Sequence, residues 1–190
     1  MPSGPNLPPL PPADGTDAAS RIRHPRIREL YRYWLAKRRG RRAPARADID
    51  PLELRSVLPH ISLFDVVEPG LRLRFRLVGT AVTVIAGETT GKFIDELVPA
   101  RVYAALHEHY VDIVRNFVGR YCVADLAWQD RPYVRYHRLL LPLSEDQQSA
   151  NMVLGIGFID EPDWRPQDVT LSRMKPLPLL LDERIVPDAE

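Results

Sequence analysis

The spacing of apolar positions near the N-terminus predicts an amphipathic helix. From about residue 24, apolar residues recur every three or four positions, so they share one face of an α-helix. This stripe consists of Ile27, Leu30, Tyr31, Trp34 and Leu35. Gly40 is a stop signal, and Pro44 opposes any continuation of the helix. Because the helix cannot bury this stripe by itself, the stripe must pack on the domain or on another chain.

A second pattern, strict alternation, predicts antiparallel strands. Residues 71–77 (LRLRFRL) put leucine and phenylalanine on one face and arginine on the other. A short helical turn from about Pro51 precedes a strand at 58–68, and a Pro-Gly turn joins the two strands into a hairpin. Three further strands are predicted at about 120–128, 133–143 and 152–160, separated by segments of turn composition.

The middle of the chain is helical. Short helical turns are predicted over 80–97, and a longer amphipathic helix follows. The apolar stripe of that helix consists of Val102, Leu106, His109, Tyr110, Ile113, Val114 and Phe117. The order of elements lacks the repeated strand–helix alternation of a parallel sheet. We therefore expect an α+β domain over 58–161, with a five-stranded antiparallel sheet and helices on one face, preceded by the amphipathic basic helix and a connector over 21–57.

Composition adds bounds to this picture. The chain has 190 residues, 45% hydrophobic and 27% charged, which is typical of one water-soluble domain. No apolar run reaches the roughly 20 residues of a membrane helix, and the N-terminus lacks the order of a secretory signal, so we expect a cytoplasmic protein. Six prolines in 1–20 predict a disordered arm, and 162–190 is expected to be an extended tail.

Charge is segregated along the chain. Residues 21–46 hold eleven basic residues and one acid, whereas the part from Ala47 onward sums to −7. Such asymmetry favours an electrostatic partner, which is either the body of the protein itself or an external polyanion.

The usual signatures of catalysis and metal binding are missing from the sequence. Ser62 and Ser144 lie in no nucleophile motif, and the five histidines show no metal-ligand spacing. Cys122, the only cysteine, can form neither an internal disulfide nor, by itself, a cysteine-based zinc site. The stretch GTAVTVIAGETTGK has its glycines and lysine misplaced for a phosphate loop. We therefore expect no enzyme and no metal site.

Several segments, in their order and spacing, carry a family resemblance. They are Trp34 in the leading helix, RADIDPLEL, the strand LPHISLFDV, and RFRLVGT followed by GETTGKFIDEL. With these segments the chain resembles the PAS family of sensory domains, in particular its short, nearly stand-alone bacterial branch. The resemblance implies a five-stranded antiparallel sheet, a hollow between helices and sheet that in some members holds a cofactor, and a role in sensing or protein association.

The resemblance also bears on cofactors, whose identity the sequence leaves unknown. Flavin photoreceptors of this family need a cysteine in an asparagine-cysteine-arginine context, whereas Cys122 lies in RYCVADL on a predicted strand, which argues against a flavin photocycle. Haem-binding members place a histidine in the helical region. Here His107 and His109 point in different directions, and we expect His109 to be a hydrogen-bonded histidine at the edge of the core rather than a haem ligand.

Polar residues on the strands are candidates for lining the hollow. Tyr133, Arg135 and His137 share one strand face, Tyr136 and Arg138 share the other, and either set could line it. An arginine in an apolar cavity would select a carboxylate or phosphate, and Arg76 could act so or belong to a salt-bridged sheet face. The candidate ligand-binding residues are Arg76, Trp128, Tyr133, Arg135, Tyr136, His137 and His109.

Two functional hypotheses follow. The first is a sensory or regulatory module in signal transduction that binds a small molecule, an unidentified signalling protein, or both. It would include a homodimer through the helix residues Tyr31, Trp34 and Leu35. The alternative is a basic-helix protein that binds a polyanion, with the PAS-like body as scaffold. Because Tyr31 and Trp34 belong to the stripe that must be buried, stacking on nucleic-acid bases would leave the core unfilled, so a solvated helix face or an acidic protein surface is favoured over nucleic acid.

Overall fold

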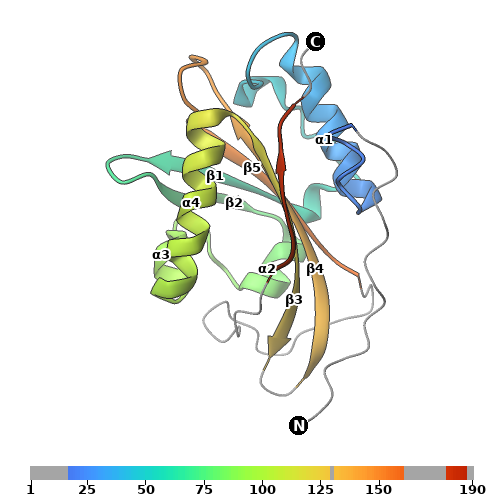
Figure 1. Ribbon diagram of the computed structural model, residues 1–190, viewed down its shortest axis with the longest axis vertical. Coiled ribbons are helices and arrows are strands. Elements are labelled where there is room, and N and C mark those ends of the chain that lie inside the picture. The colour runs from blue at the N-terminus through green and yellow to red at the C-terminus, as the bar shows by residue number, and fades with distance from the viewer. Residues whose placement is uncertain (1–16, 129–130, 161–178, 188–190) are drawn as a thin grey trace.

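One antiparallel sheet forms the centre of the computed structural model, which describes residues 17–128, 131–160 and 179–187 (Figure 1). Its strands are β1 (Ile61–Val67), β2 (Arg72–Val78), β3 (Gly119–Trp128), β4 (Arg131–Leu143), β5 (Met152–Ile159) and β6 (Leu179–Ile185). They lie in the order β2-β1-β5-β4-β3-β6, and every neighbouring pair is antiparallel. The predicted α+β class and the hairpin of β1 and β2 are confirmed.

The sheet has six strands where the sequence predicted five. Strand β6 comes from the segment expected to be an extended tail, and it pairs with β3 from Gly119↔Ile185 to Ala124↔Leu179. The Ile185 side chain is fully buried in the core. The segment LLLDERI lacks the apolar–polar alternation that marks a strand, because three leucines are followed by three charged residues.

The helices begin and end close to their predicted positions. They are α1 (Pro25–Arg38), α2 (Thr80–Ala86), α3 (Ile94–Leu97) and α4 (Ala100–Asn116), with short 3-10 turns η1 (Arg46–Asp48) and η2 (Leu58–His60). After α1 the backbone turns through positive φ at Arg39 and Gly40, as expected at a helix C-terminus. The segment after Pro51 forms successive turns that lead into η2, so β1 begins at Ile61 rather than at 58.

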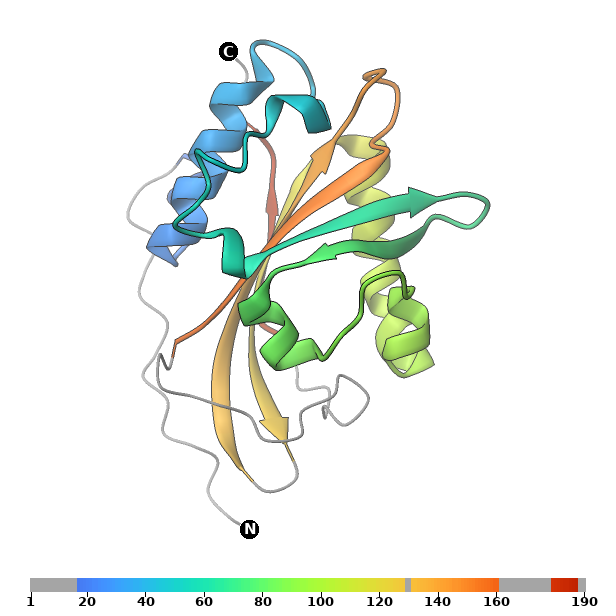
Figure 2. The same ribbon diagram turned by 180° about the vertical axis from the view of Figure 1, so that it is seen from behind.

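Helices cover both faces of the sheet, with α1 on one side and α3 and α4 on the other (Figures 1 and 2). The expectation of helices on one face therefore describes α3 and α4 but not α1. Leu139 and Leu141 of β4 pack with α1, whereas Leu140 between them packs with α4. The apolar stripe of α1 thus packs on its own domain, because alternate residues of the central strands supply an apolar surface on that side too.

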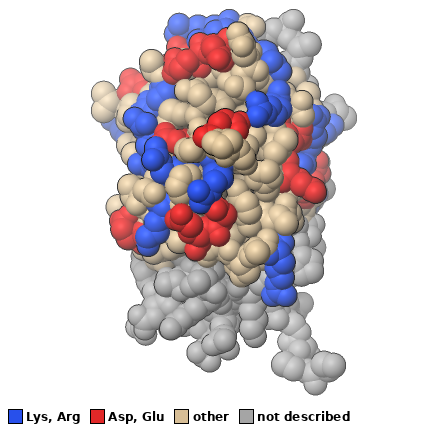
Figure 3. Space-filling model, turned by 90° about the vertical axis from the view of Figure 1, so that its left-hand side faces the viewer, with Lys and Arg blue, Asp and Glu red and all other residues tan. Residues whose placement is uncertain are grey.

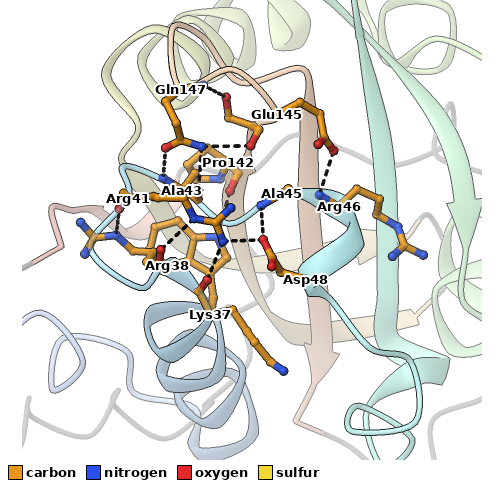
Figure 4. Close-up of polar contacts among 12 residues, drawn as sticks. Lys37, Arg38, Arg41, Ala43, Ala45, Arg46, Asp48, Pro142, Glu145 and Gln147 are labelled. Atoms are coloured by element: carbon orange, nitrogen blue, oxygen red, sulfur yellow. Dashed lines mark hydrogen bonds and ion pairs between the residues drawn. The ribbon is translucent and has the colours of Figure 1, made fainter.

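The loop after α1 is fastened to the β4–β5 turn (Figure 4). Arg38 and Arg41 each donate a side-chain hydrogen bond to the other's carbonyl, and Arg41 pairs with Asp48 at 2.5 Å. The Gln147 side chain accepts a hydrogen bond from the Ala43 N–H and donates one to the Ala43 carbonyl. Several basic residues of the charged segment are therefore used to hold this loop.

The described structure begins inside the predicted N-terminal arm. Residues 17–20 form a turn in which the Ser20 N–H donates to the Asp17 carboxylate at 2.9 Å, and Ala18 and Ala19 are buried. These four residues belong to the domain, while the rest of the arm and 161–178 lie outside the described residues. Within the described part of the chain, no helix combines the length and apolar character needed to cross a membrane.

Candidate functional site

Strand β4 carries most of the predicted ligand-binding residues, and it divides them between the two faces of the sheet. Arg135 and His137 lie four and two positions before Leu139 on the same strand, so they share its face, which is the α1 side. Tyr136 and Arg138 face the α4 side with Leu140. The predicted residues therefore do not form one site, and only the second pair faces the long helix α4.

On the α4 side, Arg138 is surrounded by groups that carry no charge at neutral pH. It lies beside Tyr110 of α4, Cys122 of β3 and Tyr136. Burial works to lower the pKa of Arg138, but these neighbours raise it by more, because each can become an anion. Tyrosine and cysteine ionise only well above neutral pH. At neutral pH these neighbours therefore offer the desolvated guanidinium no counter-charge.

The arginines of β3 and β4 differ in their acidic partners. Among the described residues, no carboxylate forms an ion pair with Arg138, whereas Arg120 faces Asp112 and Asp182, and Arg135 faces Asp125. Tyr110 Oη is buried and has no hydrogen-bond partner in the described structure. Burial raises the pKa of Tyr110 to about 12, so its hydroxyl keeps its proton. The two side chains together present a cation and a free hydroxyl donor.

A glycine makes room for Tyr136 in this cluster. Cys122, Arg138 and Gly157 lie opposite one another on β3, β4 and β5. A Cβ atom at Gly157 would come within 2.2 Å of the Tyr136 hydroxyl oxygen, so the phenol occupies the space of the missing side chain. The absence of a side chain at this position sets where the Tyr136 ring lies beside Arg138.

His109 of α4 lies at the edge of the same region and faces β6. Its Nε2 is 3.1 Å from Oδ2 of Asp182 on β6, and the Cys122 thiol lies 3.5 Å from Oδ1 of the same carboxylate. The donor atoms of His109, Cys122 and Asp182 all lie within 4.8 Å of one another. Burial lowers the pKa of His109, so the imidazole is neutral at neutral pH.

Ion pairs connect β6 to α4 around this group. Asp112 of α4 accepts hydrogen bonds from Arg184 at 2.7 and 3.1 Å, and Arg120 lies between Asp112 and Asp182 at 3.9 and 3.5 Å. The hydrogen bond from Arg184 holds the pKa of Asp112 below its usual value, although burial opposes this. The sixth strand therefore completes the polar surroundings of His109.

On the opposite face, His137 and Arg135 have structural partners. His137 is 3% exposed, with its Nδ1 2.7 Å from the Tyr121 hydroxyl and its Nε2 3.1 Å from Asp160. Arg135 pairs with Asp125 at 3.1 Å. Both predicted site residues thus lie in the core on the α1 side, next to side chains of the same chain.

Arg76 lies on the surface of the molecule. Its side chain is 60% exposed on the edge strand β2 and pairs with Asp65 at 3.2 Å, as does Arg74 at 3.0 Å. Arg72 pairs with Asp95 at 2.6 Å. Figure 3 shows basic and acidic residues interspersed on the side of the molecule with α3, α4 and this hairpin. The sequence left two alternatives for Arg76, a residue in an apolar cavity or part of a salt-bridged sheet face. The structure has the salt-bridged face.

The predicted dimer stripe of α1 is buried within the chain. Tyr31 and Trp34 have no exposed surface, and the Trp34 indole N–H donates to the Pro142 carbonyl at 2.8 Å. Leu35 is partly buried against the same core. In this chain the sheet covers the stripe, so its burial requires no second copy.

Two predicted site residues have no described side chain, and several residues of the site were not predicted. The side chains of Trp128 and Tyr133 lie outside the described residues. Arg138 was not among the predicted site residues, although strand alternation puts it on the same face as Tyr136. Tyr110 and Asp182 were also not predicted as site residues. The sequence did contain one signal for Arg138. It lies two positions before the apolar Leu140, so the charge shares a strand face that must be covered.

An antiparallel sheet with short helices and one longer helix over one face defines an α+β domain of the kind used in small sensory proteins. A family model described as PAS domain matches residues 22–157, which is most of the chain, and the chain therefore belongs to this family. PAS domains are sensory and signalling modules, so the expected family and the coarse functional class are confirmed.

Solved structures with a similar arrangement include two forms of one protein. The crystal structure of the Rhodobacter sphaeroides LOV protein aligns with a TM-score of 0.41 and 12% identity, over 60% of this chain and 70% of that chain. The RsLOV d2 variant aligns with a TM-score of 0.40 and 14% identity, over 59% and 67% of the two chains. A search among curated proteins finds no match.

Proposed function

We propose that this PAS domain is a sensory module that binds a small anionic molecule at Arg138, through a carboxylate or phosphate group, and passes the bound state on to a signalling partner. The observation that carries the proposal is the partly buried guanidinium of Arg138, which lies beside uncharged tyrosine and cysteine side chains and forms no ion pair with a carboxylate of the described residues. An isolated charge out of water is costly unless it is paired. An anionic ligand would supply the missing partner.

The chemistry around Arg138 fits an anion with oxygen acceptors. A guanidinium offers parallel N–H donors that match a carboxylate or phosphate in a bidentate way. Tyr110 Oη adds a buried hydroxyl donor that lacks a partner in the described structure. Tyr110 belongs to the apolar cluster on the α4 side that includes Phe64 and Leu140, and an apolar surrounding strengthens electrostatic attraction. The proposed activity is binding, without catalysis.

Thermal unfolding with a panel of anions tests this function. The panel consists of acetate, succinate, benzoate, inorganic phosphate and AMP, compared with chloride at constant ionic strength. A ligand at about 100 times its Kd stabilises the folded state by about 2.7 kcal/mol, which raises Tm by several degrees. The Arg138→Met variant should lose this shift, and Arg76→Met, which changes an exposed arginine, should keep it. If no anion shifts Tm and native mass spectrometry finds none bound, the proposal fails.

The ligand-free variant gives an independent readout. Removing an uncompensated desolvated charge relieves its cost, so Arg138→Met without ligand should be at least as stable to urea as the unmodified chain. An arginine that holds the fold together would behave in the opposite way. A loss of several kcal/mol in Arg138→Met would assign Arg138 a structural role.

A second candidate function rests on the outward side of α1 and its flanks. Five arginines there are exposed, and none forms an ion pair with a carboxylate of the described residues: Arg21, Arg26, Arg32, Arg39 and Arg42. These charges could hold a polyanion. Tyr31 and Trp34 are buried and unavailable for stacking, so such binding would be electrostatic. Retention on heparin that disappears between about 50 and 200 mM salt would support it, and flow-through at low salt would exclude it.

A further inference from the structure

Three side chains of different chemistry converge between α4 and the edge of the sheet. His109 comes from α4, Cys122 from β3 and Asp182 from β6, and the three lie far apart in the sequence. Cys122 is 3% exposed and the His109 side chain 13%, so most of the cluster is shielded from water. We infer that His109, Cys122 and Asp182 form a binding site for one zinc ion.

The distances between the donor atoms suit a tetrahedral ion. Zinc binds nitrogen, oxygen and sulfur at roughly 2.0–2.3 Å, which places neighbouring ligand atoms roughly 3.3–3.8 Å apart in a tetrahedron. Here Nε2 of His109 lies 3.1 Å from Oδ2 of Asp182, and Sγ of Cys122 lies 3.5 Å from Oδ1. The three donor atoms lie within 4.8 Å of one another, so small side-chain adjustments close the set.

Zinc binding would also release a proton. Zinc takes the neutral imidazole of a histidine and the deprotonated thiolate of a cysteine, so binding should tighten as the pH rises. Three protein ligands are present among the described residues, which leaves the fourth position for water or another small ligand.

Two neighbouring arginines oppose a cation at this place. Arg138 lies beside Cys122, and Arg120 Nε is 3.5 Å from Asp182. Arg120 Nε forms no hydrogen bond within the described structure, and the same side chain also faces Asp112 at 3.9 Å. Asp182 can therefore turn to zinc while Arg120 keeps Asp112. The thiolate and the Asp182 carboxylate together balance the two charges of the ion.

Cobalt substitution tests this site directly. A thiolate bound to Co²⁺ gives an intense near-ultraviolet charge-transfer band, and Cys122 is the only cysteine in the chain, so any such band reports this residue. The untagged full chain, freed of metal with a chelator, is titrated with Co²⁺ and then with Zn²⁺. We expect one equivalent of Co²⁺ to produce the band and one equivalent of Zn²⁺ to remove it. Absence of the band in the folded protein would overturn the inference.

Variants separate zinc binding from other effects. Cys122→Ser and His109→Gln should each weaken Zn²⁺ binding by about 100-fold or more, because each removes a direct ligand. His107→Gln is the matched control, since His107 lies on the same helix but its Nε2 faces the Gly70 carbonyl. Far-ultraviolet circular dichroism verifies that each variant is folded. Unchanged zinc affinity in both ligand variants would contradict the site.

The zinc site and the anion site can fail independently. Arg138→Met should keep the cobalt band because Arg138 is not a ligand, and His109→Gln should keep the anion-dependent shift in Tm. A chain that binds an anion but no metal would refute only the zinc inference.

Discussion

At the scale of single residues, Trp34 buries its apolar ring and also keeps a hydrogen bond for its indole N–H. Its ring is fully buried between α1 and the sheet, and its N–H is satisfied by the Pro142 carbonyl. The helical spacing of the sequence predicted that this side chain would be buried. Spacing could not say whether the sheet of the same chain or a second copy would cover it, because either solution removes the same apolar area from water.

Truncating Trp34 should therefore destabilise the monomer itself. We expect Trp34→Ala to lower the free energy of unfolding by about 3–5 kcal/mol through lost burial and the cavity left behind. Arg32→Ala on the exposed side of the same helix should change it by less than about 0.5 kcal/mol. Urea unfolding at several protein concentrations measures both. A concentration-dependent midpoint lost in Trp34→Ala would point instead to a dimer through the stripe.

The two arginines Arg76 and Arg138 show the limit of residue-level prediction. Arg76 alternates with apolar residues in LRLRFRL, whereas Arg138 precedes a run of three leucines, and neither local pattern shows what covers the arginine in the fold. Their strands decide the outcome. Arg76 lies on edge strand β2 beside Asp65, whereas Arg138 lies on β4 between β3 and β5 and faces α4. Strand order depends on contacts distant in sequence, and no local pattern encodes it.

At the scale of elements, β6 is the strand that the hydrophobic pattern of the sequence did not predict. The α1 and α4 stripes and the β1–β2 hairpin follow from periods within short windows, and these predictions were confirmed. Strand β6 instead pairs with β3 residues about 60 positions earlier, such as Cys122↔Asp182. Its stability comes from that pairing and from Ile185, which no periodicity in LLLDERI reveals.

Adjacent residues of β6 allow a matched test of its docking. Ile185 is fully buried and Val186 is 49% exposed. We expect Ile185→Ala to cost about 2–4 kcal/mol of unfolding free energy, because it leaves a cavity in the core. Val186→Ala should cost less than about 0.5 kcal/mol. Equal effects in urea unfolding would show that β6 is not packed on the domain.

At the scale of the whole molecule, histidines shielded from water make stability depend on pH. Burial and the proximity of His137 lower the pKa of His24 to about 4, although Asp160 works to raise it, while burial also lowers the pKa of His60 and His109. These groups are neutral in the folded state, while in the unfolded chain they take up a proton near pH 6.5. Protonation therefore favours the unfolded state.

Stability should fall as the pH is lowered from about 6.5 toward 4. For His24 we expect a loss of roughly 1–2 kcal/mol, less than the full shift would give because this residue is only partly buried. Arg26 and His60 also disfavour its charged form. The lowered pKa of Asp160 matters only below that window. Urea unfolding at constant ionic strength measures the slope, and His24→Gln should flatten it. Stability that rises on acidification would contradict the prediction.

The layering of the molecule is where sequence and structure differ most. The sequence predicted the helices, the strands and the α+β class. It also predicted helices on one face only, and it did not identify the electrostatic partner of the basic segment. Part of that segment is used internally, as in the pairs of Lys37 with Glu53 and Arg41 with Asp48. The faces that the helices cover and the partners of the basic segment depend on which surfaces meet after folding. These contacts depend on residues throughout the chain.

Strand β4 acts as a partition shared by two compartments. Tyr136 and Arg138 belong to the compartment under α4, and the intervening Arg135 and His137 belong to the one under α1. Successive side chains of a strand are rigidly attached to one backbone, so a shift of β4 that repositions Arg138 also moves His137 against Tyr121 and Asp160. A ligand that displaced β4 at Arg138 would therefore also displace the contacts of His137 on the α1 side.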